Sequence, residues 1–300
     1  MRKSALCCSL LPILASTSLA APAPPKPPRV AWQARLGGLY FDNFFQAAEG
    51  LPEENVLAAS LEGRMTARVH EDKPLEAYVE ADLIVYDGFD PSAGITLGLR
   101  QEGKPGAFDV SAQYLGGRPS REIGDEFDRA DVRALNGEYS HRIGDDFQVS
   151  ALGEFRHETF DLSPDKANDV YSLGGALRYR GFGRRFSPEI GLRRGGRGAR
   201  DDNEDLSQRE LFVRLRFNPT ESVYVTLRYR RRGRDYSIEN PGASNFGRED
   251  TRTQWTLTGD WRRSKSMTWN LYYALEDSDS TRSSGVFQTQ LLALGVTLRF

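Results

Sequence analysis

Apolar and polar residues alternate with a period of two along almost the whole chain, and this pattern constrains the fold more than any other feature. One apolar series consists of Leu75, Ala77, Val79, Ala81, Leu83 and Val85. Polar residues such as Glu76, Glu80 and Asp82 occupy the positions between them. Successive side chains of a β-strand point to opposite faces, so such a segment predicts a strand with one apolar and one hydrated face. The chain is therefore predicted to be all-β.

Fourteen segments carry this alternation, which predicts a transmembrane, antiparallel, up-and-down β-barrel of about 14 strands, within a range of about 12 to 16. The expected strands are residues 31–41, 55–69, 75–86, 93–101, 107–115, 130–142, 147–158, 170–181, 186–194, 208–217, 222–234, 251–263, 267–276 and 286–300. The alternation is interrupted at Asn136-Gly137, which suggests a β-bulge at that point.

The connections between these segments alternate in length. Short ones are residues 70–74, 102–106, 143–146, 181–185, 218–221 and 264–266, whereas long ones are 42–54, 116–129, 195–207 and 235–250. Short periplasmic turns and longer extracellular loops are typical of outer-membrane barrels. A soluble β-sandwich or β-helix would have no reason to alternate its loop lengths. An even strand number then places both chain ends on the periplasmic side. Loops 116–129 and 235–250 are long enough to fold inward and narrow the lumen.

The N-terminal segment is predicted to be an export signal. Arg2 and Lys3 precede a short apolar run, and small residues allow cleavage after Ala20. We therefore expect residues 1–20 to be a signal peptide, 21–30 a proline-rich periplasmic leader and 31–300 the barrel. Cys7 and Cys8 are the only cysteines and lie inside the signal, so no disulfide or thiolate metal site is expected in the mature chain.

Aromatic residues and the last segment indicate an outer-membrane location. The chain ends in an alternating series, Leu292, Leu294, Val296, Leu298 and Phe300, which resembles the terminal signal recognised by the barrel-assembly machinery. Aromatic residues also fall near expected strand ends, among them Trp32, Phe147, Trp261 and Trp269 at one end and Tyr40, Tyr86, Tyr114 and Tyr171 at the other. Such belts lie at headgroup depth, so outer-membrane lipid and lipopolysaccharide are expected partners.

The polar face of each strand should line the lumen, where the two halves of the barrel differ in charge. The predicted basic pore-lining residues are Arg178, Arg180, Arg193, Arg214, Arg216, Arg228, Arg230, Arg232 and Arg262, with Arg252 in the same series. The predicted acidic pore-lining residues are Glu62, Glu76, Glu80 and Asp82. Rows of arginine attract anions, so an anionic solute or an acidic polysaccharide is the expected cargo. Alternatively, these arginines pair with lumen carboxylates and only stiffen the wall.

Other classes of function find little support in the sequence. Without residues 1–20 the chain keeps 38 basic against 42 acidic residues, so nucleic acid is not an expected partner. The histidines are His70, His141 and His157, and only His157 lies where a rim lipid hydrolase needs its base, without a serine motif nearby. The acidic stretch 201–205 lacks the ligand spacing and glycine of a calcium loop. We expect no enzyme activity, metal or cofactor.

Several short stretches resemble a broad family of bacterial outer-membrane β-barrel proteins. They are Gly38-Leu39-Tyr40-Phe41-Asp42-Asn43, Arg234-Asp235-Tyr236 and Arg248-Glu249-Asp250-Thr251. The architecture also resembles monomeric fourteen-stranded porins, which implies a monomeric passive channel or export conduit. Some related barrels are linked to exopolysaccharide export, and others form the C-terminal half of surface-lipoprotein assembly modifiers. The alternative function is thus a non-conducting accessory barrel for assembly or display of surface lipoprotein or exopolysaccharide, with a rim lipid hydrolase as the third hypothesis. The modifiers carry a periplasmic helical-repeat domain, for which residues 21–29 leave no room.

Overall fold

The computed structural model describes most of the predicted barrel. The described residues are 30–42, 55–69, 74–103, 105–121, 127–182, 185–200, 205–236, 238, 241, 245–282 and 286–300. The predicted signal peptide, the leader up to residue 29, His70 and residues 201–204 lie outside the described residues.

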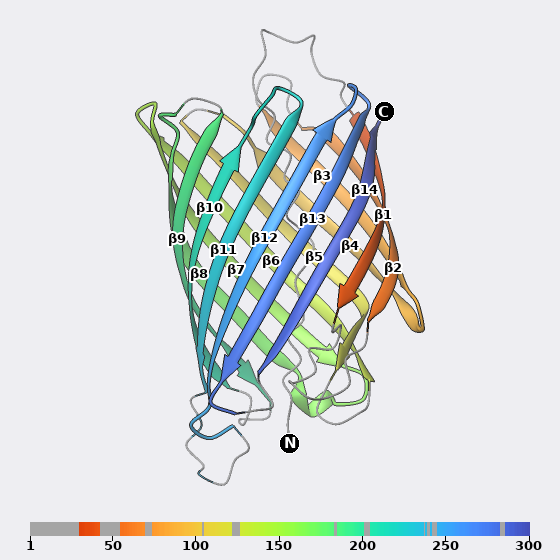
Figure 1. Ribbon diagram of the computed structural model, residues 1–300, viewed down its shortest axis with the longest axis vertical. Coiled ribbons are helices and arrows are strands. Elements are labelled where there is room, and N and C mark those ends of the chain that lie inside the picture. Colours follow the sequence, from red (N-terminus) through yellow and green to blue (C-terminus); the bar gives the residue numbers. More distant parts are fainter. Residues whose placement is uncertain are drawn as a thin grey trace.

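The described residues form fourteen strands (Figure 1). Their bounds are β1 Val30–Asp42, β2 Val56–Arg68, β3 Leu75–Tyr86, β4 Phe89–Gln101, β5 Gly106–Arg121, β6 Phe127–Ile143, β7 Phe147–Phe160, β8 Asn168–Tyr179, β9 Phe186–Ala199, β10 Leu206–Phe217, β11 Val223–Asp235, β12 Glu249–Arg262, β13 Met267–Ser280 and β14 Phe287–Arg299. A short helical turn, η1 Pro164–Lys166, lies between β7 and β8. In the described part of the chain, no helix is long and apolar enough to cross a membrane.

The strands close into a barrel. Each strand pairs in antiparallel fashion with the next, and β1 pairs with β14 from Gln33–Arg299 to Asp42–Gln290. Beyond β14, the Phe300 amide donates a hydrogen bond of 3.0 Å to the Trp32 carbonyl. Closure satisfies the backbone groups that an open sheet edge would expose, which is the condition for a sheet to span lipid. The prediction of a fourteen-stranded antiparallel barrel is confirmed.

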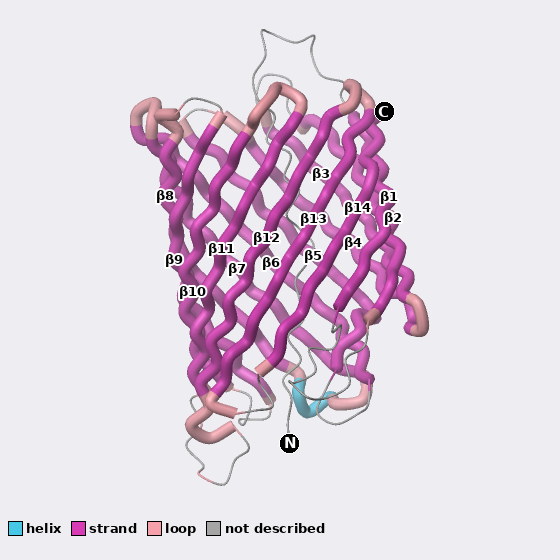
Figure 2. The backbone as a smooth tube through the Cα atoms, in the orientation of Figure 1, coloured by secondary structure: helices cyan, strands magenta, loops and turns pink. Residues whose placement is uncertain are grey.

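The two ends of the barrel differ in their connections (Figure 2). We call the end that contains Phe300 the turn end; it lies at the top of Figures 1 and 2 and includes the short β6–β7 connection, residues 144–146. The opposite loop end includes the β7–β8 connection, residues 161–167, and the β11–β12 connection, residues 236–248. Since short turns of outer-membrane barrels lie in the periplasm, the orientation predicted from the sequence puts the turn end in the periplasm and the loop end at the cell surface.

Several strands extend further toward the loop end than the sequence predicted. β5 ends at Arg121 instead of residue 115, β9 at Ala199 instead of residue 194, and β13 at Ser280 instead of residue 276. Most residues of these extensions are polar or glycine, so the apolar alternation that marks a membrane-spanning strand stops before the hydrogen-bonded strand does.

The bulge expected at Asn136-Gly137 is absent, and that prediction was wrong. The β6–β7 register runs without interruption through Asn136–Glu154 and Gly137–Gly153. Register shifts occur instead between Ile84 and Tyr86 on β3 and between Leu115 and Arg118 on β5. The glycine at position 137 faces outward with open space around it, so the break in alternation is a missing side chain and not an inserted residue.

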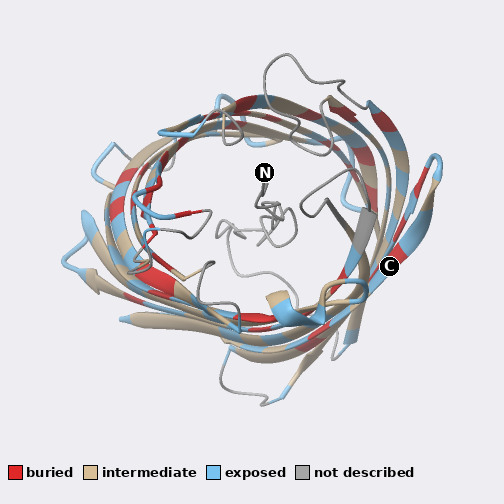
Figure 3. Ribbon diagram, turned by 90° about the horizontal axis from the view of Figure 1, so that it is seen from below, coloured by how far each residue is buried: buried red, intermediate tan, exposed pale blue. Residues whose placement is uncertain are grey.

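An apolar band covers the outer face of the barrel, and a polar lining covers the inner face. Leu36, Leu173 and Leu192 point outward and are 57%, 72% and 63% exposed. Charged or polar residues such as Asp82, Glu189 and Thr256 point inward and are largely buried. Seen along the axis in Figure 3, the strands form a ring in which buried and exposed residues alternate along each strand. An apolar exterior on a closed barrel is suited to lipid contact.

Candidate functional site: the arginine wall

The interior face of β8–β12 carries a large excess of arginine, and we call this half of the lining the arginine wall. In the described strands its inward positions hold eleven arginines: Arg178, Arg193, Arg197, Arg214, Arg216, Arg228, Arg230, Arg232, Arg234, Arg252 and Arg262. The same positions hold four carboxylates: Glu189, Glu210, Asp250 and Asp260. Register partners share one face of a sheet, so the pairing places all of these side chains on the inside.

All nine predicted basic residues lie on this wall or at its edge. Eight are on the strands, and Arg180 directly follows β8 and donates a 3.1 Å hydrogen bond to Gln148 on the interior face of β7. Arg197 and Arg234 also lie on this wall but were not among the predicted residues. Both continue the two-residue spacing of their strands, Arg197 into a segment expected to be a loop, and that spacing is the signal that could have identified them.

Glu189 on β9 holds one group of arginines together. Its carboxylate oxygens lie 2.7 Å from Arg178, 2.8 Å from Arg214 and 3.5 Å from Arg216. The three arginines come from β8 and β10, the two strands that flank β9. A single carboxylate compensates only one of the three charges, so this group keeps a positive excess.

Glu210 on β10 holds a second group in the same way. Arg232 donates two hydrogen bonds to Glu210 Oε2, at 3.1 Å from Nε and 2.9 Å from Nη2. Arg228 and Arg230 lie 3.6 and 3.9 Å from the Glu210 carboxylate. Because Glu210 is only 5% exposed, its charge is shared by buried guanidinium groups and not by bulk water.

Phe212 lies between the two groups and was not foreseen. It points inward, is 1% exposed, and its ring centroid is 5.1 Å from the Arg228 guanidinium and 5.7 Å from that of Arg214. Cations are attracted to the face of an aromatic ring, so Phe212 packs under the arginines without neutralising them. The ring occupies the space that a side chain on Gly191 would need. The signal that could have identified Phe212 is an apolar residue at an inward position of its strand, opposite a glycine on the neighbouring strand.

A small recess extends the arginine wall toward the loop end. It is lined by Arg230, Arg232, Arg252, Gln254 and Glu276. Glu276 on β13 accepts a 3.0 Å hydrogen bond from Gln254 and lies 3.5 Å from Arg252 and 3.9 Å from Arg230. Arg232 and Arg252 are direct cross-strand neighbours on β11 and β12, so two like charges face each other at this level.

A buried network fixes the loop end of β11 and β12. Arg248 donates hydrogen bonds of 2.8 Å to each oxygen of Asp250 and one of 3.1 Å to Asn245. The Arg248 guanidinium also lies 4.8 Å from the ring centroid of Tyr236, and Ser280 on β13 donates to Asp250 at 2.6 Å. These contacts join the described part of the 235–250 connection to β12 and β13.

In the opposite half of the lining, three of the four predicted acidic residues are paired with arginine. The predicted acidic residues Glu62, Glu76, Glu80 and Asp82 all point inward from β2 and β3. Glu76 lies 2.7 Å from Arg100, Glu80 lies 3.6 Å from Arg64, and Glu62 lies 3.9 Å from Arg35. Tyr78 joins this set, since its hydroxyl donates a 2.9 Å hydrogen bond to Asp109 and Arg64 lies 4.2 Å from its ring centroid. The lumen therefore has a basic half and a balanced half.

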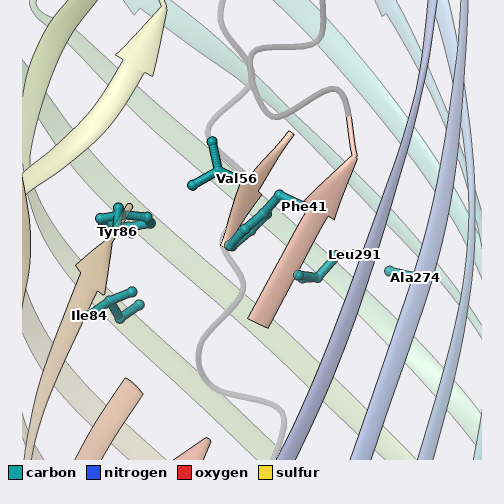
Figure 4. Close-up of a cluster of buried hydrophobic side chains, with 6 residues drawn as sticks. All are labelled: Phe41, Val56, Ile84, Tyr86, Ala274 and Leu291. Atoms are coloured by element: carbon teal, nitrogen blue, oxygen red, sulfur yellow. The ribbon is translucent and has the colours of Figure 1, made fainter. Parts of the chain in front are cut away.

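An apolar patch interrupts the polar lining near the loop end of β1–β3 and β13–β14. Figure 4 shows its members, which are Phe41, Val56, Ile84, Tyr86, Ala274 and Leu291. Tyr86 was expected in the outer aromatic belt, but it points inward and its hydroxyl lies 3.2 Å from that of Ser92. The apolar run 83–86 is compatible with either face, and the strand register decides which residues turn inward.

His157 lies on the outer face of β7. Its Nδ1 atom is 2.8 Å from a carboxylate oxygen of Asp169, and Arg133 is its cross-strand neighbour on β6. No serine is among its register partners on the described strands. In the described part of the chain, no group of His, Cys, Asp and Glu side chains is arranged to hold a metal ion.

Comparison with protein-family models gives no match, and neither does comparison with curated protein sequences. Solved structures do match. A loop L8 deletion mutant of OmpT, an outer-membrane protein of Vibrio cholerae, has a TM-score of 0.50 at 10% identity over 90% of this chain and 99% of its own. The outer-membrane channel DcaP of Acinetobacter baumannii has a TM-score of 0.48 at 11% identity, over 90% and 96% of the two chains. An anion-selective porin from Comamonas acidovorans has a TM-score of 0.47 at 11% identity, over 90% of this chain and 99% of its own.

The likeness to OmpT identifies the fold, and the closed barrel with its apolar exterior agrees with it. The chain therefore has the closed antiparallel β-barrel fold of outer-membrane proteins such as OmpT.

Proposed function

We propose that this barrel is a passive channel whose arginine wall favours anionic solutes or an acidic polymer. The observation that supports this most directly is the ratio of eleven inward arginines to four inward carboxylates on the described strands β8–β12. Glu189 and Glu210 each contact three arginines, so local pairing leaves several guanidinium charges uncompensated.

The physical basis is the attraction between a row of cations and a passing anion. Guanidinium groups bind carboxylate and phosphate oxygens through two parallel hydrogen bonds, and rows of arginine select anions in pores. The balanced half of the lining contributes little net field, so the potential across the lumen falls from the arginine wall toward β2 and β3. We further propose that the barrel acts as a monomer and has no catalytic role.

Planar-bilayer recording tests this proposal. The refolded protein should give steady single-channel conductance, and the reversal potential in a KCl gradient should indicate preference for chloride. A variant with Arg214→Gln, Arg228→Gln and Arg230→Gln should lose most of this preference, because three lumen charges are removed while side-chain size is nearly kept.

The matched control removes three positive charges from the turn end. Arg185→Gln, Arg263→Gln and Lys265→Gln change exposed residues outside the arginine wall, so chloride preference should stay close to that of the wild type. We call this variant the turn-end control. A correctly folded, heat-modifiable barrel that conducts no ions would contradict the channel and favour the accessory role in surface lipoprotein or exopolysaccharide assembly. Equal loss of selectivity in both variants would contradict the role of the arginine wall.

A further inference from the structure

The outer face of each strand changes from apolar to polar near the loop end, and the polar residues there differ around the barrel. On β9 the outward series Phe186, Pro188, Ile190 and Leu192 is followed by Arg194. On β10, Leu215, Val213 and Leu211 are followed by Arg209. On β11, Val225, Leu227 and Tyr229 are followed by Arg231. Three neighbouring strands therefore place an arginine directly above the apolar band.

Arg194, Arg209 and Arg231, which we call the rim arginines, are neighbours in space. Arg194 and Arg209 are direct cross-strand partners, and Arg231 lies diagonally from Arg209, because it pairs with Leu211. Adjacent strands are about 4.8 Å apart, so the three side chains arise from a surface about 10 Å wide. All three are exposed.

The rim arginines are not neutralised by an ion pair within the described part of the protein. None of them forms an ion pair or a side-chain hydrogen bond there, although Asp235 lies diagonally from Arg209 on the same face. Their direct cross-strand partners, apart from each other, are Leu173, Leu211, Gly233 and Thr253. Like charges directly opposite each other destabilise a sheet, so this arrangement favours an external anion.

The surroundings of the rim arginines leave space for such a ligand. Gly233, opposite Arg209, presents no side chain on the outer face. A side chain at position 233 would meet nothing within 4 Å. Below the arginines, the rings of Tyr229 and Trp255 pack together with centroids 4.8 Å apart. Aromatic rings of this kind lie at the depth of lipid headgroups, which puts the arginines at the level of the headgroup charges.

The rim on β13, β14 and β1 has a different charge. On β13 the outward residues at the loop end are Asp277 and Asp279, on β14 they are Gln288 and Gln290, and β1 ends with Asp42. A rim that needed only polar residues above the apolar band would not separate its charges in this way. Arg133 on β6 also points outward near the loop end, whereas β9–β11 bring three such arginines together.

We propose that the rim arginines are a docking site for the phosphate groups of lipopolysaccharide in the outer leaflet. The ligand must be anionic, must lie at the upper edge of the apolar band, and must have acyl chains that cover Leu192, Leu211 and Leu227 below the arginines. A phosphorylated glycolipid meets all three conditions, and guanidinium is the side chain best suited to phosphate. The site is on the outside of the barrel and does not depend on the proposed channel.

Native mass spectrometry of the detergent-solubilised barrel with diphosphoryl lipid A tests this site. The variant Arg194→Gln, Arg209→Gln, Arg231→Gln should bind at least about tenfold more weakly than the wild type, because it loses the charge-assisted hydrogen bonds from guanidinium to phosphate. The turn-end control should bind like the wild type. Monophosphoryl lipid A should bind more weakly to the wild type and lose less on substitution.

Three outcomes would overturn the site: equal lipid A binding by the rim variant and the wild type, an equal loss in the turn-end control, or displacement by phosphatidylglycerol at the same concentration as lipid A. Heat-modifiable migration on gels reports whether each variant is folded. If the triple variant does not fold, Arg209→Gln alone, at the centre of the group, is compared with the wild type for lipid A binding. Ion conductance of the rim variant should match that of the wild type, which separates this test from that of the channel.

Discussion

At the scale of single residues, the arginine wall depends on two glutamates. Glu189 and Glu210 each contact three arginines and are 7% and 5% exposed. Removing one partner of a buried ion pair is more costly than replacing the whole pair, because the remaining charge is left uncompensated. These carboxylates are therefore more important for stability than any single arginine around them.

Glu210→Gln should lower the free energy of unfolding by about 3 kcal/mol, because Arg228, Arg230 and Arg232 would then repel one another without a shared counter-charge. The same change should increase the preference for chloride, since it removes a negative charge from the wall. Urea unfolding in detergent micelles measures the first effect and the reversal potential the second. Glu221→Gln, at an exposed position between β10 and β11, is the control and should change neither. A stable variant with unchanged selectivity would contradict the assigned role of Glu210.

At the scale of secondary structure, a glycine on one strand makes room for an aromatic ring on the neighbouring strand. The Tyr78 ring on β3 lies over Gly98, its register partner on β4, and occupies the space of the missing side chain. This position lets the Tyr78 hydroxyl reach Asp109 on β5 while Arg64 of β2 packs on the ring. One glycine on β4 thus allows side chains of three other strands, β2, β3 and β5, to meet.

Gly98→Ala should displace the Tyr78 ring and reduce stability by about 1 to 3 kcal/mol, the usual cost of overpacking. Gly63→Ala is the matched control: this glycine faces outward on β2 with nothing within 4 Å, so the added methyl group should be tolerated. The midpoint of the heat-modifiability transition on gels compares the two variants. Equal midpoints would contradict the packing described for Tyr78.

At the scale of the whole molecule, Phe300 is predicted to act in the insertion of the barrel into the membrane and to contribute little to its stability. The side chain is 77% exposed, and its contacts with β1 are backbone hydrogen bonds with Trp32, which any residue could form. The structure thus gives the aromatic ring little part in holding the barrel closed, in keeping with its predicted role as an insertion signal.

Phe300→Ala should leave refolding in detergent nearly unchanged but lower the amount of protein inserted in the outer membrane of cells several-fold. Membrane fractionation measures insertion, and urea unfolding of the refolded protein measures stability. Trp269→Ala removes another exposed aromatic ring at the turn end, 47% exposed on β13, and should insert normally. A matching loss of insertion in both variants would show that Phe300 acts only as one member of the aromatic belt.

The sequence by itself determined the all-β barrel class, the antiparallel order and the two faces of most strands, and it predicted about fourteen strands within a range of 12 to 16. Alternation from Leu75 to Val85 or from Leu292 to Phe300 requires a lipid face and an interior face, whatever the partners are. The inward direction of the predicted arginines followed from the same alternation, which is a local property. The sequence could not locate the ends of β5, β9 and β13, because hydrogen bonding continues where the apolar pattern has stopped.

Only the tertiary structure decided which side chains meet. The register sets Arg194 opposite Arg209 and puts Arg232 opposite Arg252, and a shift of one residue would change every such pair. The register also places Phe212 and Tyr86 on the polar inner face, although both side chains are largely apolar. These contacts join strands that are far apart in sequence, as in the Glu276–Arg230 pair, so no local pattern encodes them. Alternation determines the face of a residue, whereas closure of the barrel determines its neighbours.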